Sequence, residues 1–315
     1  MTWFMYLFTA VVVLLSVTAL FFFTVTRGAL LFRSATSSNT DAAAHVYPIY
    51  SNMRLIRMVD FQPIISAILL FQYHRLVSLI VDGLHKQNLR DKDVLITSCA
   101  FGNVIPRVVT AAVEGDVRQV MIADIIKNEL DHAERKLLDF TPKLKMLQQN
   151  AIAMELPDNS VAANVMFFLL HELPHHLKGQ ALKEAGRVLI PGGTLYLAEF
   201  HRPEPWVLRA LSWTYFKVFE PLGLALWDSH DPLNQLEALG GFTCVRRTYF
   251  FGNFQVIVAT KDLPRLRDRP SQTHYYFGSG WANRSSIAET KSLLSGAVRL
   301  LKLSTEVPER SIRYL

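Results

Sequence analysis

"VLITSCAFGN", from Val94 to Asn103, is the stretch of sequence that decides the fold. Its first half is apolar, which is typical of a buried strand. Its second half is a turn of mostly small residues with one glycine, Gly102. A strand that ends in such a turn before a helix is where parallel sheets bind nucleotides. The turn lacks most of the glycines and the acidic residue that usually accompany such a site.

The stretch opens a regular alternation of short apolar segments with longer helical ones. This alternation predicts an α/β domain with a parallel sheet and helices on both faces. The segment 162–170 is apolar on both faces, as a central parallel strand should be. The predicted helices are 104–115, 126–140 and 174–189. The predicted strands are 93–98, 117–124, 143–149, 162–170 and 194–200, followed by two strands within 243–260 that are joined near Gly252 and Asn253.

Composition excludes some classes of protein. Hydrophobic residues make up 50% of the 315 residues and charged residues 19%, which suits a folded core with extra apolar surface. The net charge of +6 is mild and no basic tract alternates with aromatic residues, so we expect no nucleic-acid partner. With two cysteines, a disulfide framework is not expected and a reducing compartment is the simpler reading.

The N-terminal segment is uncharged from Met1 to Thr26 and is long enough to cross a bilayer as a helix. Arg27 and Arg33 follow it and no basic residue precedes it, so the positive-inside rule places the following body in the cytoplasm. A secretory signal peptide is the alternative, but it usually has a basic start and a shorter apolar core. We therefore predict a single-pass membrane anchor.

Four segments follow from these features. They are the anchor (1–27), a polar linker (28–44), the α/β domain (45–262) and a basic tail (263–315). The tail is predicted either to touch anionic lipid headgroups or to be loosely packed or disordered. At the start of the domain, 61–84 is predicted to form a helix that packs on the domain or lies in the membrane interface.

An acidic residue lies about twenty positions after the turn. Asp124 ends the second predicted strand, and this spacing suits a carboxylate that accepts hydrogen bonds from a ribose diol. The late segment "EAGRVLIPGGTLYL" (184–197) completes a known pattern. Together these features resemble the class I S-adenosylmethionine-dependent methyltransferases. Against that family, Ile96 replaces an acid and Ser98 and Ala100 replace glycines.

The resemblance implies a Rossmann-like fold with a mostly parallel seven-stranded sheet and an antiparallel last strand. It implies S-adenosylmethionine as the cofactor, held in an altered pose by the modified turn. Asp124 falls where the family holds the ribose, and Ala151 and Ile152 fall near the adenine. The implied cofactor-binding residues are Thr97, Ser98, Cys99, Gly102, Asp124, Ile125, Ala151 and Ile152.

A narrower resemblance covers roughly residues 47–260. The segments that carry it are "TSCAFGN" (97–103), "FFLLHELP" (167–174), "EFHRPEPW" (199–206), "FEPLGLALW" (219–227) and "RTYFFGNFQVIVAT" (247–260). In this order they are similar to the rhodoquinone-biosynthesis proteins. That resemblance implies a lipophilic quinone substrate, ubiquinone, in which an amino group from S-adenosylmethionine replaces a ring methoxy group. It also implies a divalent metal such as Mn²⁺.

Two histidines follow neighbouring predicted strands, His171 with Glu172 and then His201. The carboxyl ends of parallel strands share one edge of the sheet, so we expect these three candidate catalytic residues near the cofactor. They would divide acid and base roles or, with Glu199, hold a divalent metal. The alternative is structural: His171 caps the next helix and His201 pairs with a backbone carbonyl. We expect Cys99 to be a packed residue rather than a nucleophile.

Two further clusters bear on the substrate. Helices in the aromatic segment 205–227 are predicted to roof the site and receive the quinone ring and its isoprenoid tail, beside ordinary core packing. Asp228, His230 and Asp231 are expected to be solvated loop residues.

Three functions stay open: amino transfer to a membrane quinone, methyl transfer to a quinone or other lipid, and a non-catalytic scaffold at a membrane. The oligomeric state is not predicted.

Overall fold

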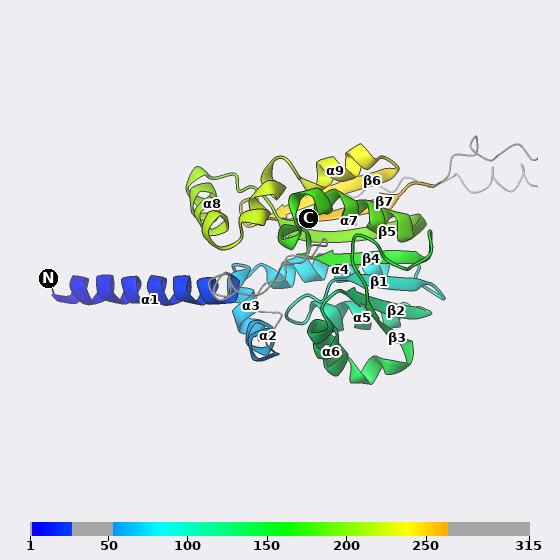
Figure 1. The fold of residues 1–315 in the computed structure, drawn as a ribbon, viewed down its shortest axis with the longest axis horizontal. Helices are drawn as coiled ribbons and strands as arrows, with labels where there is room; N and C mark the ends of the chain where they lie inside the picture. The colour runs from blue at the N-terminus through cyan, green and yellow to red at the C-terminus, as the bar shows by residue number, and fades with distance from the viewer. Residues whose placement is uncertain (1, 27–52, 264–315) are drawn as a thin grey trace, which may run out of the picture. The chain divides into compact units, whose positions relative to one another are not determined.

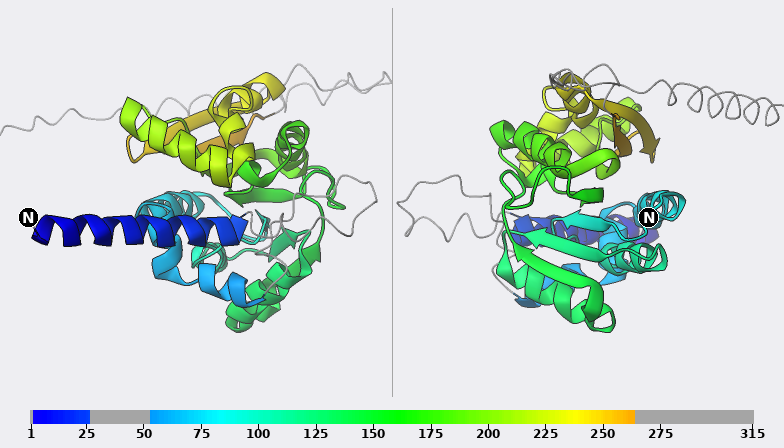
Figure 2. Two further views of the ribbon diagram at one scale, coloured as in Figure 1. Left: turned by 60° about the vertical axis from the view of Figure 1, so that its left-hand side comes forward. Right: turned by 90° about the vertical axis from the view of Figure 1, so that its right-hand side faces the viewer.

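The computed structural model describes residues 2–26 and 53–263. The predicted linker and the tail from residue 264 lie outside the described residues. So do Arg27 and Arg33, on which the predicted sidedness depends. Figures 1 and 2 show the described elements.

The uncharged N-terminal segment forms one continuous helix, α1 (Thr2–Thr26). Its stretch Trp3–Leu20 is long and apolar enough to cross a membrane, and none of that stretch is buried against the rest of the protein. A signal sequence near the N-terminus can pass the same test of length and hydropathy. The helix is therefore a candidate span, as the sequence predicts.

A seven-stranded sheet forms the centre of the domain, in the order β3-β2-β1-β4-β5-β7-β6 (Figure 1). Strands β1 to β5 are parallel, and β7 is antiparallel to both of its neighbours. This confirms the mostly parallel sheet with an antiparallel last strand. The strands are β1 (Asp93–Thr97), β2 (Gln119–Asp124), β3 (Leu144–Gln148), β4 (Val161–Phe167), β5 (Leu189–Phe200), β6 (Phe242–Tyr249) and β7 (Phe254–Lys261).

Helices cover both faces of the sheet because successive strand residues point to opposite sides. In β1, Val94 and Ile96 belong to one hydrophobic cluster and Leu95 to another. Every residue of β1 and β4 is buried, as expected for central strands. The first cluster includes residues of α4 (Tyr73–Lys86), α5 (Val104–Glu114) and α6 (Lys127–Lys136), and the second includes residues of α7 (His175–Val188) and α9 (Pro232–Leu239).

The helix predicted over 61–84 is broken in two. After α2 (Met53–Val59), α3 (Gln62–Ile68) and α4 meet at 99°. Between them Leu70 and Phe71 have φ of 50° and 59°, a left-handed conformation that ends a helix. The packing of α4 on the sheet confirms that part of the prediction.

Two predicted boundaries were wrong. The helix predicted over 126–140 ends at Lys136 and is followed by the 3₁₀ helix η2 (Leu138–Lys143). The "IPGG" turn lies inside β5, which begins at Leu189. A Cβ on Gly193 would lie 2.9 Å from the Ile190 carbonyl oxygen and 3.0 Å from that of Ala162. The glycine therefore allows close approach within the sheet instead of ending a turn.

The aromatic segment forms helices as predicted. They are α8 (Trp206–Phe219) and the 3₁₀ helix η4 (Pro221–Trp227). The Phe216 ring on α8 packs at 4.8 Å from the ring of Phe200, the last residue of β5, and at 5.8 Å from Trp227. This places α8 at the carboxyl end of the sheet, where both candidate histidines lie (Figures 1 and 2).

Candidate functional site

The turn after β1 is tight and is tied to the end of β2. Ser98 has φ 80°, a conformation that favours glycine, and its amide donates to the Ala123 carbonyl. The Cys99 amide donates to Asp124 Oδ2 at 2.6 Å. A serine in this conformation costs on the order of 1–3 kcal/mol. The backbone of the turn thus keeps a conformation typical of glycine, although serine replaces the glycine at this position.

Gly102 is held by protein groups. It also has φ 80°, and a Cβ there would lie 2.5 Å from the Tyr73 hydroxyl. Its amide donates to Asp60 Oδ1 at 2.8 Å, and the Val104 amide donates to the Tyr73 hydroxyl at 2.6 Å. The first amides of α5, which the resemblance places against a nucleotide, are therefore engaged by side chains from the α2–α4 segment. Gly102 thus has a packing role that the resemblance of the chain to the methyltransferase family did not imply.

Asp60 connects three elements at this position. Lys136 Nζ on α6 donates to Asp60 Oδ1 at 2.7 Å and to the Gly102 carbonyl at 2.6 Å. His132 Nε2 lies 3.0 Å from the other oxygen, Asp60 Oδ2. The sequence analysis missed this group because its members are about 40 to 75 residues apart in the chain and only the fold brings them together.

Asp124 lies where the spacing predicts, buried at the end of β2. Its Oδ1 accepts from the Ile126 amide at 2.8 Å, and its Oδ2 accepts from Cys99. Burial raises the pKa of this carboxyl, and these hydrogen bonds oppose the rise. The Ile125 amide and the Cys99 thiol interact with the same carboxyl. Asp124 thus lies at the predicted position at the end of β2, and its ribose contact stays a prediction.

Glu129, in the first turn of α6, is the feature of this region that the sequence analysis missed. It is 3% exposed, and its Oε1 has no hydrogen-bond partner among the described residues. Burial, helped by the charges of Asp124, Glu172 and Asp60, raises its pKa to about 9. In sequence it looks like an ordinary helix-start acid. Lys136 is the one cation among the charges that act on Glu129. This mostly acidic cluster therefore favours a cationic ligand.

The other residues implied in cofactor binding also lie around this edge. The Thr97 hydroxyl donates to Asn164 Oδ1 at 2.8 Å in the core. Ile125 is 39% exposed beside Asp124. Ala151 and Ile152 are half-buried in the loop after β3, packed against the second hydrophobic cluster. Cys99 is buried, and burial with nearby Asp124 raises the pKa of its thiol. That supports packing over nucleophilic attack for Cys99.

His171 lies in the short 3₁₀ helix η3 (Leu170–Glu172), buried among carboxylates. Its Nδ1 is 3.3 Å from Glu199 Oε2, and its Nε2 is 3.7 Å from Glu220 Oε2 and 3.9 Å from Glu172 Oε1. Burial alone lowers the pKa of the imidazole, but the carboxylates outweigh it and raise the pKa to about 9. His171 is therefore a cation at neutral pH. It suits proton donation or a fixed positive charge better than the role of a base.

Lys178, on α7, is fully buried in the same region. Its ammonium donates to the Leu170 carbonyl and interacts with Glu199 and Glu172. Burial lowers its pKa to about 8. The sequence analysis missed this residue because nothing in a helical pattern marks one lysine as buried.

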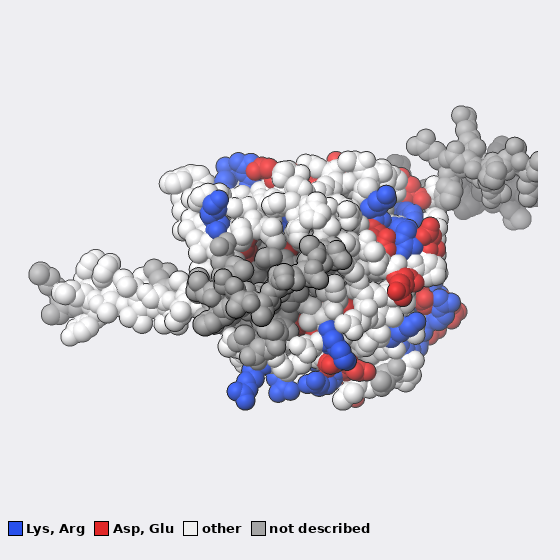
Figure 3. Space-filling model, viewed as in Figure 1, with Lys and Arg blue, Asp and Glu red and all other residues white. Residues whose placement is uncertain are grey.

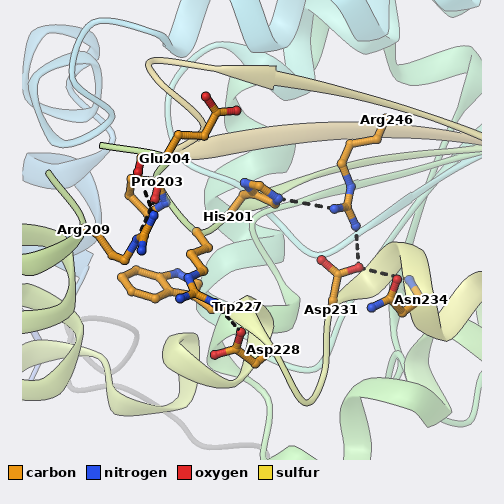
Figure 4. Close-up of a pocket in the computed structure, with 10 residues that line it drawn as sticks. His201, Pro203, Glu204, Arg209, Trp227, Asp228, Asp231, Asn234 and Arg246 are labelled. Atoms are coloured by element: carbon orange, nitrogen blue, oxygen red, sulfur yellow. Dashed lines mark hydrogen bonds and ion pairs between the residues drawn. The ribbon is translucent and has the colours of Figure 1, made fainter. Parts of the chain in front are cut away.

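His201 lies apart from His171. Its Nδ1 is 2.6 Å from the Gly252 carbonyl, which confirms the alternative prediction of a backbone partner. Its Nε2 accepts from Arg246 Nη1 at 3.3 Å. The imidazole lines a pocket of about 510 Å³ under α8 (Figure 4). The strand-end position did bring both histidines to one end of the sheet, but into different surroundings.

The pocket that His201 lines is rich in paired charges. Arg246 bonds Asp231 (Figure 4). Arg202 Nη1 bonds Asp228 Oδ1 at 2.9 Å. Asp231 is 6% exposed and caps α9 by accepting from the Asn234 amide. The expectation that Asp231 is a solvated loop residue was therefore wrong, because the arginine from β6 covers it. Trp227 forms an apolar part of the wall.

The part of the chain that the structure describes has no preformed site for the divalent metal that the resemblance implies. No group of three or more His, Cys, Asp or Glu side chains there is arranged to hold a metal ion.

Comparisons with known proteins agree with this geometry. The model of the ubiE/COQ5 methyltransferase family matches residues 59–237. A demethylmenaquinone methyltransferase of Bacillus licheniformis is 30% identical over 108 residues, covering 34% of this chain and 45% of that protein. The ubiquinone/menaquinone biosynthesis C-methyltransferase UbiE of Shewanella oneidensis is 33% identical over 125 residues, covering 39% and 49%.

The chain spans about half the length of the curated relatives it matches. Among solved structures, an S-adenosylmethionine-dependent methyltransferase from Aquifex aeolicus has a TM-score of 0.48 and 17% identity, covering 67% of this chain and 98% of that one. The segment matched by the family model is more than half of the 315 residues. The chain therefore belongs to the ubiE/COQ5 methyltransferase family.

Proposed function

We propose that this protein is an S-adenosylmethionine-dependent transferase that acts on a membrane quinone. The observation that carries the proposal is the family match over 59–237, because the matching relatives are named for methyl transfer in menaquinone and ubiquinone biosynthesis. The candidate span α1, as a membrane anchor, would support it physically. A polyprenylated substrate stays in the bilayer, and a tethered enzyme meets it at a higher local concentration.

The cofactor would be held at the carboxyl edge of β1 and β2. Asp124 would accept hydrogen bonds from the ribose, and Ile125 and Ile152 would flank the adenine. Glu129 and Glu172 would face the cationic methionine end, whose positive charge would lower the raised pKa of Glu129 and favour its ionised form. When bound, the sulfonium compound supplies the electrophilic or transferable group. The chain's own residues orient it and exclude water.

The quinone ring would enter under α8, between the His171 region and the pocket of His201. A pocket of about 510 Å³ is within the usual range for small-molecule sites. His171, protonated near neutral pH, would donate a hydrogen bond or a proton to a ring oxygen. Lys178 and Glu199 would set its charge and orientation.

Amino transfer that yields a rhodoquinone is our first choice of reaction. It is supported by the narrower resemblance and by the altered turn, in which Gly102 and the first amides of α5 are engaged by Asp60 and Tyr73. These contacts favour a cofactor pose different from that of a glycine-rich turn. In this reaction a proton from His171 would go to the departing methoxy oxygen.

Methyl transfer to a quinone ring is the second choice, and the names of the relatives favour it. The acceptor would be the reduced hydroquinone form of the ring. His171 would stabilise a ring oxygen as an anion while the adjacent ring carbon takes the methyl group from sulfur, and that carbon would then lose its proton to solvent. Sidedness belongs to the proposal too: α1 would span the membrane once, with the domain in the cytoplasm.

The mass of the product distinguishes these reactions. The full chain in detergent is incubated with S-adenosylmethionine and a short-chain ubiquinone, and in parallel with a demethylated quinone that dithionite has reduced to its hydroquinone, each with and without Mn²⁺. Replacement of methoxy by amino supports the first choice, and a gain of one methyl group supports the second. Asp124→Asn is the matched inactive control. If neither product forms and S-adenosylmethionine does not raise the melting temperature, the protein is a scaffold and the proposal is wrong.

A further inference from the structure

Helix α8 is unusual because its outer face is apolar. Only Phe216 of its fourteen residues is buried. At about 100° per residue, the exposed positions fall on one continuous face. A helix on the surface of a soluble domain normally turns polar residues outward. The residues of the outer face are Trp206, Val207, Ala210, Leu211, Trp213, Thr214, Lys217 and Val218.

The exposure of this face is large. Trp206 is 77% exposed, Leu211 65% and Val207 50%, and Trp213 and Val218 are close to half exposed. Exposing two tryptophans on one helix face to water is unfavourable in free energy, but tryptophan side chains suit the boundary between headgroups and acyl chains. The inner face contacts the site: Phe216 packs on Phe200.

A second apolar projection lies at the same end of the sheet. We call it the elbow: Phe61, at the start of α3, with Leu70 and Phe71 between α3 and α4. Phe61 is 60% exposed and Phe71 77%. The elbow sits at the carboxyl edge because Asp60 beside it bonds the amide of Gly102. Figures 1 and 2 show α8 and α3 at this same end of the domain.

Basic side chains outnumber acidic ones next to these projections; the acidic neighbours are Asp60, which is paired with Lys136, and Glu204 and Glu220 at the two ends of α8. Helix α8 contains Arg209 and Lys217 and no acidic residue, and α2 contains Arg54 and Arg57 and no acidic residue. Arg75, beside the elbow, is also exposed. In Figure 3 the surface around α8 is mostly uncharged, with a few basic side chains and an acidic patch beside one of them at the top. Apolar aromatic projections with basic flanks complement an anionic lipid surface.

We infer that α8 and the elbow together form a surface that docks into the headgroup region of an anionic bilayer, as a membrane contact additional to α1. This surface places the carboxyl edge of the sheet, with the His201 pocket and the His171 region, against the lipid. The docking follows from exposure and charge alone. Entry of a quinone from the bilayer under α8 rests in addition on the proposed function.

The test measures lipid contact position by position in the full chain. The protein is reconstituted into vesicles of phosphatidylcholine and phosphatidylglycerol, with an NBD fluorophore on Leu211→Cys or Phe71→Cys. Cys244 is replaced by serine, and Cys99 is buried and stays. Glu114→Cys, exposed at the end of α5 on the opposite edge of the sheet, is the matched control.

We expect the probes at 211 and 71 to shift to shorter emission wavelengths and to be strongly quenched by spin-labelled lipids, while the probe at 114 stays unquenched. Equal behaviour of all three probes would overturn the inference, as would failure of the protein to float with the vesicles. Disulfide cross-linking between copies through position 211, without lipid quenching, would show instead that α8 pairs with a second copy. The readout needs neither cofactor nor turnover, so its failure is distinguishable from failure of the proposed function.

Discussion

The two candidate histidines lie at the ends of adjacent elements of one sheet edge, yet their surroundings are opposite. His171 is buried among the carboxylates of Glu172, Glu199 and Glu220. His201 lies between a backbone carbonyl and the guanidinium of Arg246 in a pocket with three arginines. The difference teaches that the strand end fixes where a side chain is, whereas its neighbours from other elements decide whether it carries a proton.

This comparison predicts different kinetic effects for the two residues. His171→Gln should lower kcat by roughly 10²–10⁴-fold, because it removes the proton donor at the ring. His201→Gln should act mainly on the KM for the quinone, because this side chain lines the pocket. Steady-state kinetics with a short-chain quinone measures both. Equal losses of kcat in the two variants would remove the distinction between the two regions.

The second prediction concerns stability. Glu199 is fully buried, and its Oε1 and Oε2 accept from the amides of His171 and Phe200. Glu199→Ala removes the carboxylate nearest to the buried His171 and should lower the free energy of unfolding by about 3–5 kcal/mol. Asp228→Ala, which removes the exposed partner of Arg202, should cost about 0–1 kcal/mol. Urea denaturation followed by circular dichroism checks both, and similar losses would contradict the burial argument.

The third prediction is a pH dependence. The folded pKa of His171 is raised to about 9 from 6.5, so the folded state binds this proton more tightly than the unfolded state. The resulting stability is fully present below about pH 6.5 and is lost as the pH rises towards 9. The difference in unfolding free energy between wild type and His171→Gln should therefore shrink between these two values. A difference that stays constant over this window would contradict the raised pKa of His171.

The sequence predicted much of the framework. Alternating apolar segments gave the order of strands and helices, since the periods of two and 3.6 are local properties. The position of Asp124 followed from spacing, and the tight turn followed from "TSCAFGN". Contacts between elements that are distant in the sequence were not predictable. Asp60 bonds Gly102 across 42 residues, and Arg246 on one element covers Asp231 on another. Burial of Lys178 and Glu129 likewise depends on packing that a single sequence does not encode locally.

The smallest predicted effect concerns the turn itself. Ser98 has φ 80°, and glycine adopts this conformation without strain. Ser98→Gly should raise the free energy of unfolding by about 1 kcal/mol. Ala100→Gly, at a residue with no positive φ, is the matched control and should not stabilise the protein. A stabilisation by Ala100→Gly equal to that by Ser98→Gly would contradict the assignment of strain to Ser98.

The central claim is that a cationic nucleoside binds at the edge of β1 and β2. Isothermal titration of the full chain with S-adenosylmethionine and, separately, with the uncharged S-adenosylhomocysteine tests it most directly. We predict saturable binding that Asp124→Asn weakens for both compounds, and that Glu129→Gln weakens more for the sulfonium compound. Unchanged affinity for both compounds in both variants would contradict the account.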